Sequence, residues 1–272
     1  PTGHLRLKSS ICIMKNFFRQ NLGLYMMEAL GLAIFMISAC FFAAVLESKE
    51  SFVRQAIANE TGRNLLMGAA MGLTALFIFY FRFTAPSGSQ INPAVTLAFL
   101  RAGKINRRDA FFYIVFQFIG GTVAVYGMQL LLGDLLTAQP VNSVATVPHK
   151  GGIAAAFFME FFTAFAMMTM VLFTSAHERW KKYTRLIAAT LVCLYVIIAG
   201  PVSGFGMNPA RSFASALPAH TWTAFWIYLI APIAGMLGAA ELFLHIQKKK
   251  RRFSYAAHRS KNNLLEPLEF VI

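Results

Sequence analysis

Ser87-Gly88-Ser89-Gln90-Ile91-Asn92-Pro93-Ala94-Val95-Thr96 decides how this chain folds, because the same pattern returns as Ser203-Gly204-Phe205-Gly206-Met207-Asn208-Pro209-Ala210-Arg211-Ser212. In each stretch a glycine-bearing loop leads through Asn-Pro-Ala into an apolar segment. Asn is a favoured N-cap, and Pro suits the first helical position because its missing N–H would be unpaired there. The pattern predicts two short helices, Pro93 to Arg101 and Pro209 to Leu217. About nine helical residues rise roughly 14 Å, half of a ~30 Å hydrocarbon core.

The composition indicates a membrane protein. Of the 272 residues, 57% are hydrophobic and 13% are charged, which excludes an ordinary soluble domain. A net charge of +14 is compatible with nucleic-acid binding. However, the cations lie between apolar segments instead of forming one polar face, so we expect no nucleic-acid partner. The sequence contains no catalytic triad, metal-ligand spacing or nucleotide-binding loop, and we expect neither an enzyme nor a cofactor.

Long apolar segments predict an all-α membrane protein with six transmembrane helices and two re-entrant half-helices. The spans are expected at residues 22–46, 64–83, 110–132, 152–174, 186–201 and 222–246. A membrane-spanning domain at 22–246 would then follow an N-terminal segment, 1–21, and precede a basic tail, 247–272. Met14-Lys15-Asn16 resembles a natural start, so residues 1–13 are interpreted as a dispensable leader or remnant.

The distribution of cations predicts an orientation in the membrane. In the six-span arrangement 20 of the 25 Lys and Arg residues fall on one side. They belong to the N-terminal segment, the connections at 82–108 and 177–185, and the tail. The positive-inside rule makes this side cytoplasmic, with both termini inside, and we expect the plasma membrane.

The two halves repeat in sequence. Met27-Glu28-Ala29 opens the first half and Met159-Glu160-Phe161 opens the second, and each is followed by two further spans and an Asn-Pro-Ala. Repeat one covers 22–132 and repeat two covers 152–246. Three spans in each half place the halves in opposite orientations, so the chain is expected to be an inverted repeat. Interrupted helices at matching positions of such halves indicate the functional site.

With these features the chain resembles the aquaporin, or major intrinsic protein, family over residues 20–246. The residues that carry the resemblance are Glu28, Ser87-Gly88, Asn92 to Thr96, Gln117, Gly120-Gly121, Glu160, Asn208 to Phe213, Pro232 and Gly235. The resemblance implies a channel in which the half-helices meet at the bilayer midplane. Asn92 and Asn208 would turn amide N–H groups toward a passing solute, and the positive helix ends would exclude protons and cations. Each Asn could instead act only as an N-cap.

The resemblance also implies a constriction. Arg211 would supply a fixed positive charge there, although it could instead only hold a loop carbonyl. Counting from the two Asn residues places Gly72, Val196 and Phe205 beside it. Gly72 and Val196 predict a wider and more apolar neck than a water-only filter has, and Phe205 resembles glycerol facilitators. Ser212 resembles water channels instead, so the two indications conflict.

Three polar residues inside the predicted spans have alternative interpretations. Glu28 and Glu160 could form a proton relay, but their symmetric placement favours a bracing role in which each accepts hydrogen bonds from the N–H groups of a re-entrant loop. Gln117 is interpreted as a polar packing residue.

The tail from Lys248 to Arg252 could bind anionic lipid or simply flank the last span.

These observations predict a passive channel for water and small uncharged solutes such as glycerol, urea or ammonia. By resemblance, four copies would assemble into a homotetramer, with membrane lipid around it. Two alternatives are a proton-coupled secondary transporter, which also uses inverted repeats, and a structural membrane protein with a closed pore.

Overall fold

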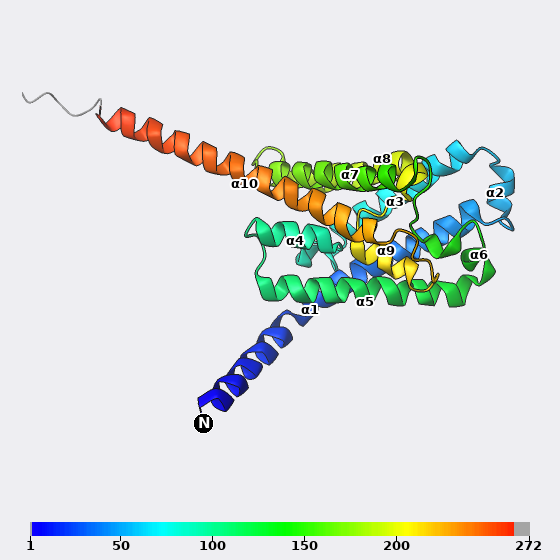
Figure 1. Ribbon diagram of the computed structural model, residues 1–272, viewed down its shortest axis with the longest axis horizontal. Coiled ribbons are helices and arrows are strands. Elements are labelled where there is room, and N and C mark those ends of the chain that lie inside the picture. The colour runs from blue at the N-terminus through cyan, green and yellow to red at the C-terminus, as the bar shows by residue number, and fades with distance from the viewer. Residues whose placement is uncertain (1, 264–272) are drawn as a thin grey trace, which may run out of the picture.

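The computed structural model describes the backbone of residues 2–263 and the side chains of residues 18–249. Residue 1 and residues 264–272, which include the end of the predicted basic tail, lie outside the described residues. Every regular element of the described part is a helix (Figure 1). Its long helices are α1 (Thr2–Glu47), α3 (Glu60–Tyr80), α5 (Arg107–Leu132), α7 (Gly152–Ser175), α8 (Thr184–Ser203) and α10 (Trp226–Asn263).

Six of these helical segments are long and apolar enough to cross a membrane. The half-helices are α4 (Pro93–Arg101) and α9 (Pro209–Ala216), so both begin at the proline of Asn-Pro-Ala. Short elements complete the connections: α2 (Phe52–Ala56), α6 (Asp134–Thr137) and the 3₁₀ turns η1 (Ala85–Ser87), η2 (Asn142–Val144) and η3 (Lys181–Tyr183). The predicted six-span fold with two half-helices is therefore confirmed.

Helix ends differ from the sequence prediction where a local cap decides them. The second span begins at Glu60 instead of residue 64, because the Asn59 side chain accepts hydrogen bonds from the N–H groups of Thr61 and Gly62, at 2.9 and 3.4 Å. The sixth begins at Trp226 instead of residue 222, because tight turns occupy the residues before it. The first residues of α1 and the last residues of α10 extend beyond the helical bundle on the same side (Figure 1).

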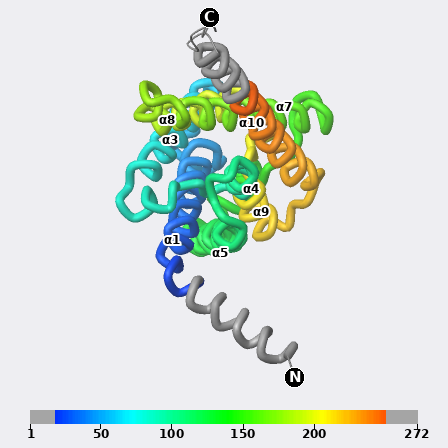
Figure 2. Tube along the Cα trace, turned by 90° about the vertical axis from the view of Figure 1, so that its left-hand side faces the viewer, coloured from blue at the N-terminus to red at the C-terminus, as the bar shows by residue number. Residues whose placement is uncertain are grey.

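Two pairs of helices pack in the same way in the two halves. α1 packs on α5 and α7 packs on α10, while the halves meet where α3 packs on α8, α4 on α10 and α5 on α9. A Cβ atom on Gly120 would lie 2.2 Å from the Ala29 carbonyl oxygen, and one on Gly235 would lie 2.4 Å from the Phe161 carbonyl oxygen. Only glycine permits backbones to approach this closely. Figure 2 shows the half-helices α4 and α9 inside the ring of long helices.

Candidate functional site

The N-termini of the two half-helices meet through their asparagines. Asn92 Oδ1 accepts from the Ala94 N–H at 2.9 Å, and its Nδ2 donates to the Met207 carbonyl at 2.9 Å. Asn208 Oδ1 accepts from the Ala210 N–H at 3.0 Å, and its Nδ2 donates to the Ile91 carbonyl at 2.7 Å. Each Asn is thus an N-cap and also a link to the loop of the other half. An amide group carries two N–H donors, so one on each Asn remains for another partner.

Glu28 holds the first loop. Its carboxylate is fully buried and accepts from the Gln90 and Ile91 N–H groups at 3.0 and 2.6 Å, and from the Ser87 hydroxyl at 2.6 Å. Gln117 Nε2 adds a donor at 2.8 Å, so this residue contacts the bracing carboxylate directly. A buried carboxylate needs several donors to offset lost hydration, and here it finds four.

Glu160 holds the second loop in the matching way. It is fully buried, and it accepts from the Gly206 N–H at 2.8 Å, from the Met207 N–H and from the Ser203 hydroxyl at 2.6 Å. Neither Glu160 nor Glu28 lines the cavity that the described residues enclose. Their hydrogen bonds go to the loops, which favours the bracing interpretation over a proton relay.

The two loops share an unusual backbone. Ser89 and Ile91 have φ values of 47° and 44°, and Phe205 and Met207 have 49° and 45°. Left-handed φ is costly for residues with side chains, most of all for a β-branched one such as Ile91. The carboxylates bind N–H groups of these same segments, so each Glu stabilises a conformation that the loop would otherwise leave.

Two tyrosines that sequence reasoning missed also hold the loops. Tyr113 donates its hydroxyl to the Ser87 carbonyl at 3.0 Å, and Tyr228 donates to the Ser203 carbonyl at 2.7 Å. They occupy corresponding positions in the third helix of each half, which is the signal that could have identified them. Each loop is therefore bound by a glutamate from the first helix and a tyrosine from the last helix of its own half.

A cavity of about 470 Å³ runs beside these loops through the bundle. Its lining follows α8 along its length, with Thr184, Ala188, Val192, Val196 and Gly200. At 1.5 Å per residue this is a path of about 24 Å, most of the thickness of a hydrocarbon core. Both loops and both asparagines belong to the lining, which is what allows irregular backbone at membrane depth.

The structure differs from the sequence prediction at Gly72. This residue faces α8, where a Cβ atom would lie 2.7 Å from Cys193 Cβ, and it does not line the cavity. Met71 lines the cavity in its place, and it is buried. Successive helical residues are rotated by about 100°, so an error of one residue in counting back from Asn92 moves a position to another face of the helix.

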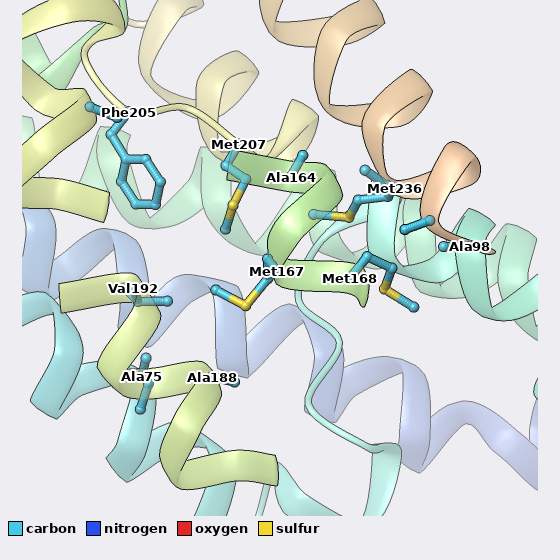
Figure 3. Packing of buried hydrophobic residues seen from close by; sticks show 14 of the residues in the cluster. Ala75, Ala98, Ala164, Met167, Met168, Ala188, Val192, Phe205, Met207 and Met236 are labelled. Carbon is cyan, nitrogen blue, oxygen red and sulfur yellow. The ribbon is translucent and has the colours of Figure 1, made fainter. Parts of the chain in front are cut away.

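Val196 and Phe205 lie on the cavity with Met71, as do Met167 and Met207. Figure 3 shows the side chains of Phe205 and Met207 extending from the loop before α9 toward Val192 and Met167. This part of the lining consists of thioether, aromatic and aliphatic groups. Such a surface offers few hydrogen bonds, and the polar groups of the lining belong to the loops, to both asparagines and to residues such as Arg211 and Asn64.

Arg211 lies in the first turn of α9, and it lines the cavity although only 8% of it is exposed. Its Nη1 donates to the Val144 carbonyl at 2.9 Å. Val144 has a φ of 53°, an unfavourable value for a β-branched residue. The neighbouring Ser143 accepts a hydrogen bond at 2.9 Å from Gln129 Nε2, which holds the turn in place. Arg211 thus both binds a loop carbonyl and presents a cation to the cavity.

Comparisons with known proteins agree with this arrangement. The chain matches the family model described as Major intrinsic protein over residues 18–243. It is 31% identical over 224 residues to aquaporin NIP1-2 of Arabidopsis thaliana, covering 80% of this chain and 72% of that protein. It is 34% identical over 176 residues to aquaporin NIP1-1 of the same plant, covering 63% of this chain and 59% of the relative.

Among solved structures, the fold is similar to that of the aquaglyceroporin from Plasmodium falciparum. The TM-score is 0.66 at 20% sequence identity, and the match covers 82% of this chain and 95% of that one. The paired half-helices, the inverted repeat and the family match over most of the sequence lead to one assignment: this chain belongs to the major intrinsic protein family.

Proposed function

We propose that this chain is a passive channel for water and small uncharged solutes. The observation that carries the proposal is the cavity along α8, which is lined by both re-entrant loops and by Asn92 and Asn208. The names of the relatives, aquaporins, and of the similar structure, an aquaglyceroporin, support it. A solute oxygen can accept from the free N–H of each asparagine, and the positive ends of α4 and α9 disfavour cations at the same place.

Within this channel we assign the selectivity constriction to Met71, Val196, Phe205 and Arg211. Three of these side chains are apolar, and one is a fixed cation and donor. An apolar wall beside one donor suits a solute that has both carbon and hydroxyl groups, and it also passes water. The proposal therefore includes solutes of the size of glycerol or urea.

The membrane context is also part of the proposal. The basic connections and termini favour an orientation with both ends in the cytoplasm, and the plasma membrane is the expected location. Exposed apolar side chains such as Leu73, Leu130 and Leu131 cover the outside of the bundle, where lipid or neighbouring copies would contact them. A homotetramer is the expected assembly.

Stopped-flow light scattering of proteoliposomes tests the function. The purified chain should accelerate water efflux and the uptake of glycerol, urea or ammonia above protein-free liposomes, with a low activation energy. A proton gradient should leave these rates unchanged. A rate equal to that of protein-free liposomes would support a closed structural protein, and uptake driven by the gradient would support a transporter.

Replacing Arg211 should weaken the exclusion of cations. In Arg211→Ala the fixed charge disappears from the constriction, so cation leakage and urea flux should rise. Arg211→Lys keeps the charge but loses the planar fork, and it should retain more of the cation exclusion. Ion conductance and urea uptake of both variants, measured beside the wild type, check this. Equal selectivity in all three proteins would contradict a filter role for Arg211.

Met71 and Gly72 should respond differently to substitution. Met71→Ala removes side-chain atoms from the cavity wall, so the ratio of glycerol to water permeability should rise several-fold. Gly72→Ala instead places a methyl group against Cys193 and should lower the yield of folded protein. Leu73→Ala is the matched control, because Leu73 is 68% exposed on the same helix. A higher glycerol ratio in folded Gly72→Ala, with no change in Met71→Ala, would restore Gly72 to the constriction.

A further inference from the structure

Helix α8 has a missing hydrogen bond in its last turns. Pro201 lies inside this helix and has no N–H, so the carbonyl of Ile197, four residues earlier, has no helical partner. A helix bends most readily where such a bond is absent. The defect lies directly after Val196, one of the four residues assigned to the constriction.

Asn64 of α3 supplies the missing donor. Its Nδ2 donates to the Ile197 carbonyl at 2.8 Å, so a side chain of one helix completes the hydrogen bonding of another. Asn64 also lines the cavity, as does Gly200 of α8. This polar residue is therefore placed at the defect and beside the solute path at the same time.

α3 and α8 pack so closely around this hydrogen bond that it can fix the distance between the two helices. A Cβ atom on Gly68 would lie 2.5 Å from Ile197 Cγ1, and one on Gly72 would lie 2.7 Å from Cys193 Cβ. The two glycines let α3 and α8 approach closely. Asn64 lies one turn before Gly68 on the same face of α3, and its hydrogen bond joins the two helices there. Met71 follows two turns later on α3, so α3 and α8 each carry one wall of the constriction.

We propose that Asn64 is a positioning residue for solute selectivity. By binding the carbonyl that Pro201 leaves free, it holds the part of α8 that carries Val196 against α3, and so it sets the width between Val196 and Met71. This role rests on the proposed channel function. Asn64 and Pro201 thus set the width of the constriction although neither side chain is part of it.

The test uses Asn64→Leu, which has nearly the shape of Asn but no donor, so that any widening cannot come from missing atoms. In proteoliposomes the ratio of glycerol to water permeability should rise by roughly fivefold, the factor that one net hydrogen bond corresponds to. Leu65→Ala, on the same helix at a 49% exposed position, is the control and should leave the ratio unchanged.

A second substitution isolates the mechanism. Pro201→Ala restores an N–H at position 201, so Ile197 regains a partner within α8 and Asn64→Leu should then change the ratio much less. Equal shifts of the ratio in the two backgrounds, or no shift in Asn64→Leu, would overturn the role. If Asn64→Leu alone does not fold, the variant that also carries Pro201→Ala should recover folded protein, and failure to recover it counts against the role. Absence of water flux in the wild type would overturn the channel function and this role with it.

Discussion

Gly120→Ala should abolish assembly of the folded bundle, whereas Gly127→Ala on the same helix should leave it intact. The added Cβ atom at position 120 would lie 2.2 Å from the Ala29 carbonyl oxygen and 2.6 Å from its Cα, while nothing lies within 4 Å at position 127. The first contact is with backbone, so α1 and α5 must separate along their whole interface. A loss of about 4 kcal/mol or more is expected from such a contact.

The measurement is the yield of monodisperse protein after extraction in mild detergent, together with its thermal midpoint. Gly235→Ala should behave like Gly120→Ala, because its Cβ atom would lie 2.4 Å from the Phe161 carbonyl oxygen. Normal yield of Gly120→Ala would show that α1 and α5 do not pack as described.

Glu160→Ala should remove most of the solute flux. It leaves the buried Gly206 and Met207 N–H groups without their acceptor, and each unpaired group costs about 1–3 kcal/mol, while the Ser203 hydroxyl retains the Ala199 carbonyl as an acceptor. The loop has left-handed residues that this carboxylate stabilises, so it should relax and obstruct the cavity. Water permeability per folded protein should fall by an order of magnitude. A loss of about 1.4 kcal/mol already lowers the ratio of the open to the obstructing loop conformation tenfold.

Glu160→Gln separates bracing from proton coupling. Its amide oxygen can still accept from two donors, while its NH₂ cannot accept from the third, so flux should lie between those of the wild type and Glu160→Ala. Neither variant should acquire or lose a response to a proton gradient. Glu178→Ala is the control, because the Glu178 side chain is 87% exposed. Full activity of Glu160→Ala would contradict the bracing role.

The sequence predicted the half-helices well because their starts are local. Asn-Pro-Ala contains both a cap and a proline that suits the first turn, and the structure begins α4 at Pro93 and α9 at Pro209. Long apolar segments likewise identified the six spans. The matching positions of Glu28 and Glu160 indicated acceptors for the loops, and both carboxylates make those hydrogen bonds.

Features that depend on helix rotation or on distant contacts were not accessible in this way. Gly72 was assigned to the cavity by counting along the chain, but the rotation of α3 turns Met71 there instead. The partner of Arg211 is the carbonyl of Val144, whose turn is held by residues far apart in sequence. Hydrophobic patterns do not specify such contacts.

The exchanged hydrogen bonds of Asn92 and Asn208 have a consequence for biogenesis. Asn92 donates to the Met207 carbonyl, and Asn208 donates to the Ile91 carbonyl, so each re-entrant segment lacks one hydrogen bond until the other repeat is present. The first repeat is synthesised before the second, so the Asn92 amide has no Met207 carbonyl to bind until the chain has been extended by more than a hundred residues. Because the cavity lining also draws on both repeats, the passage is complete only after the second repeat has been synthesised and inserted.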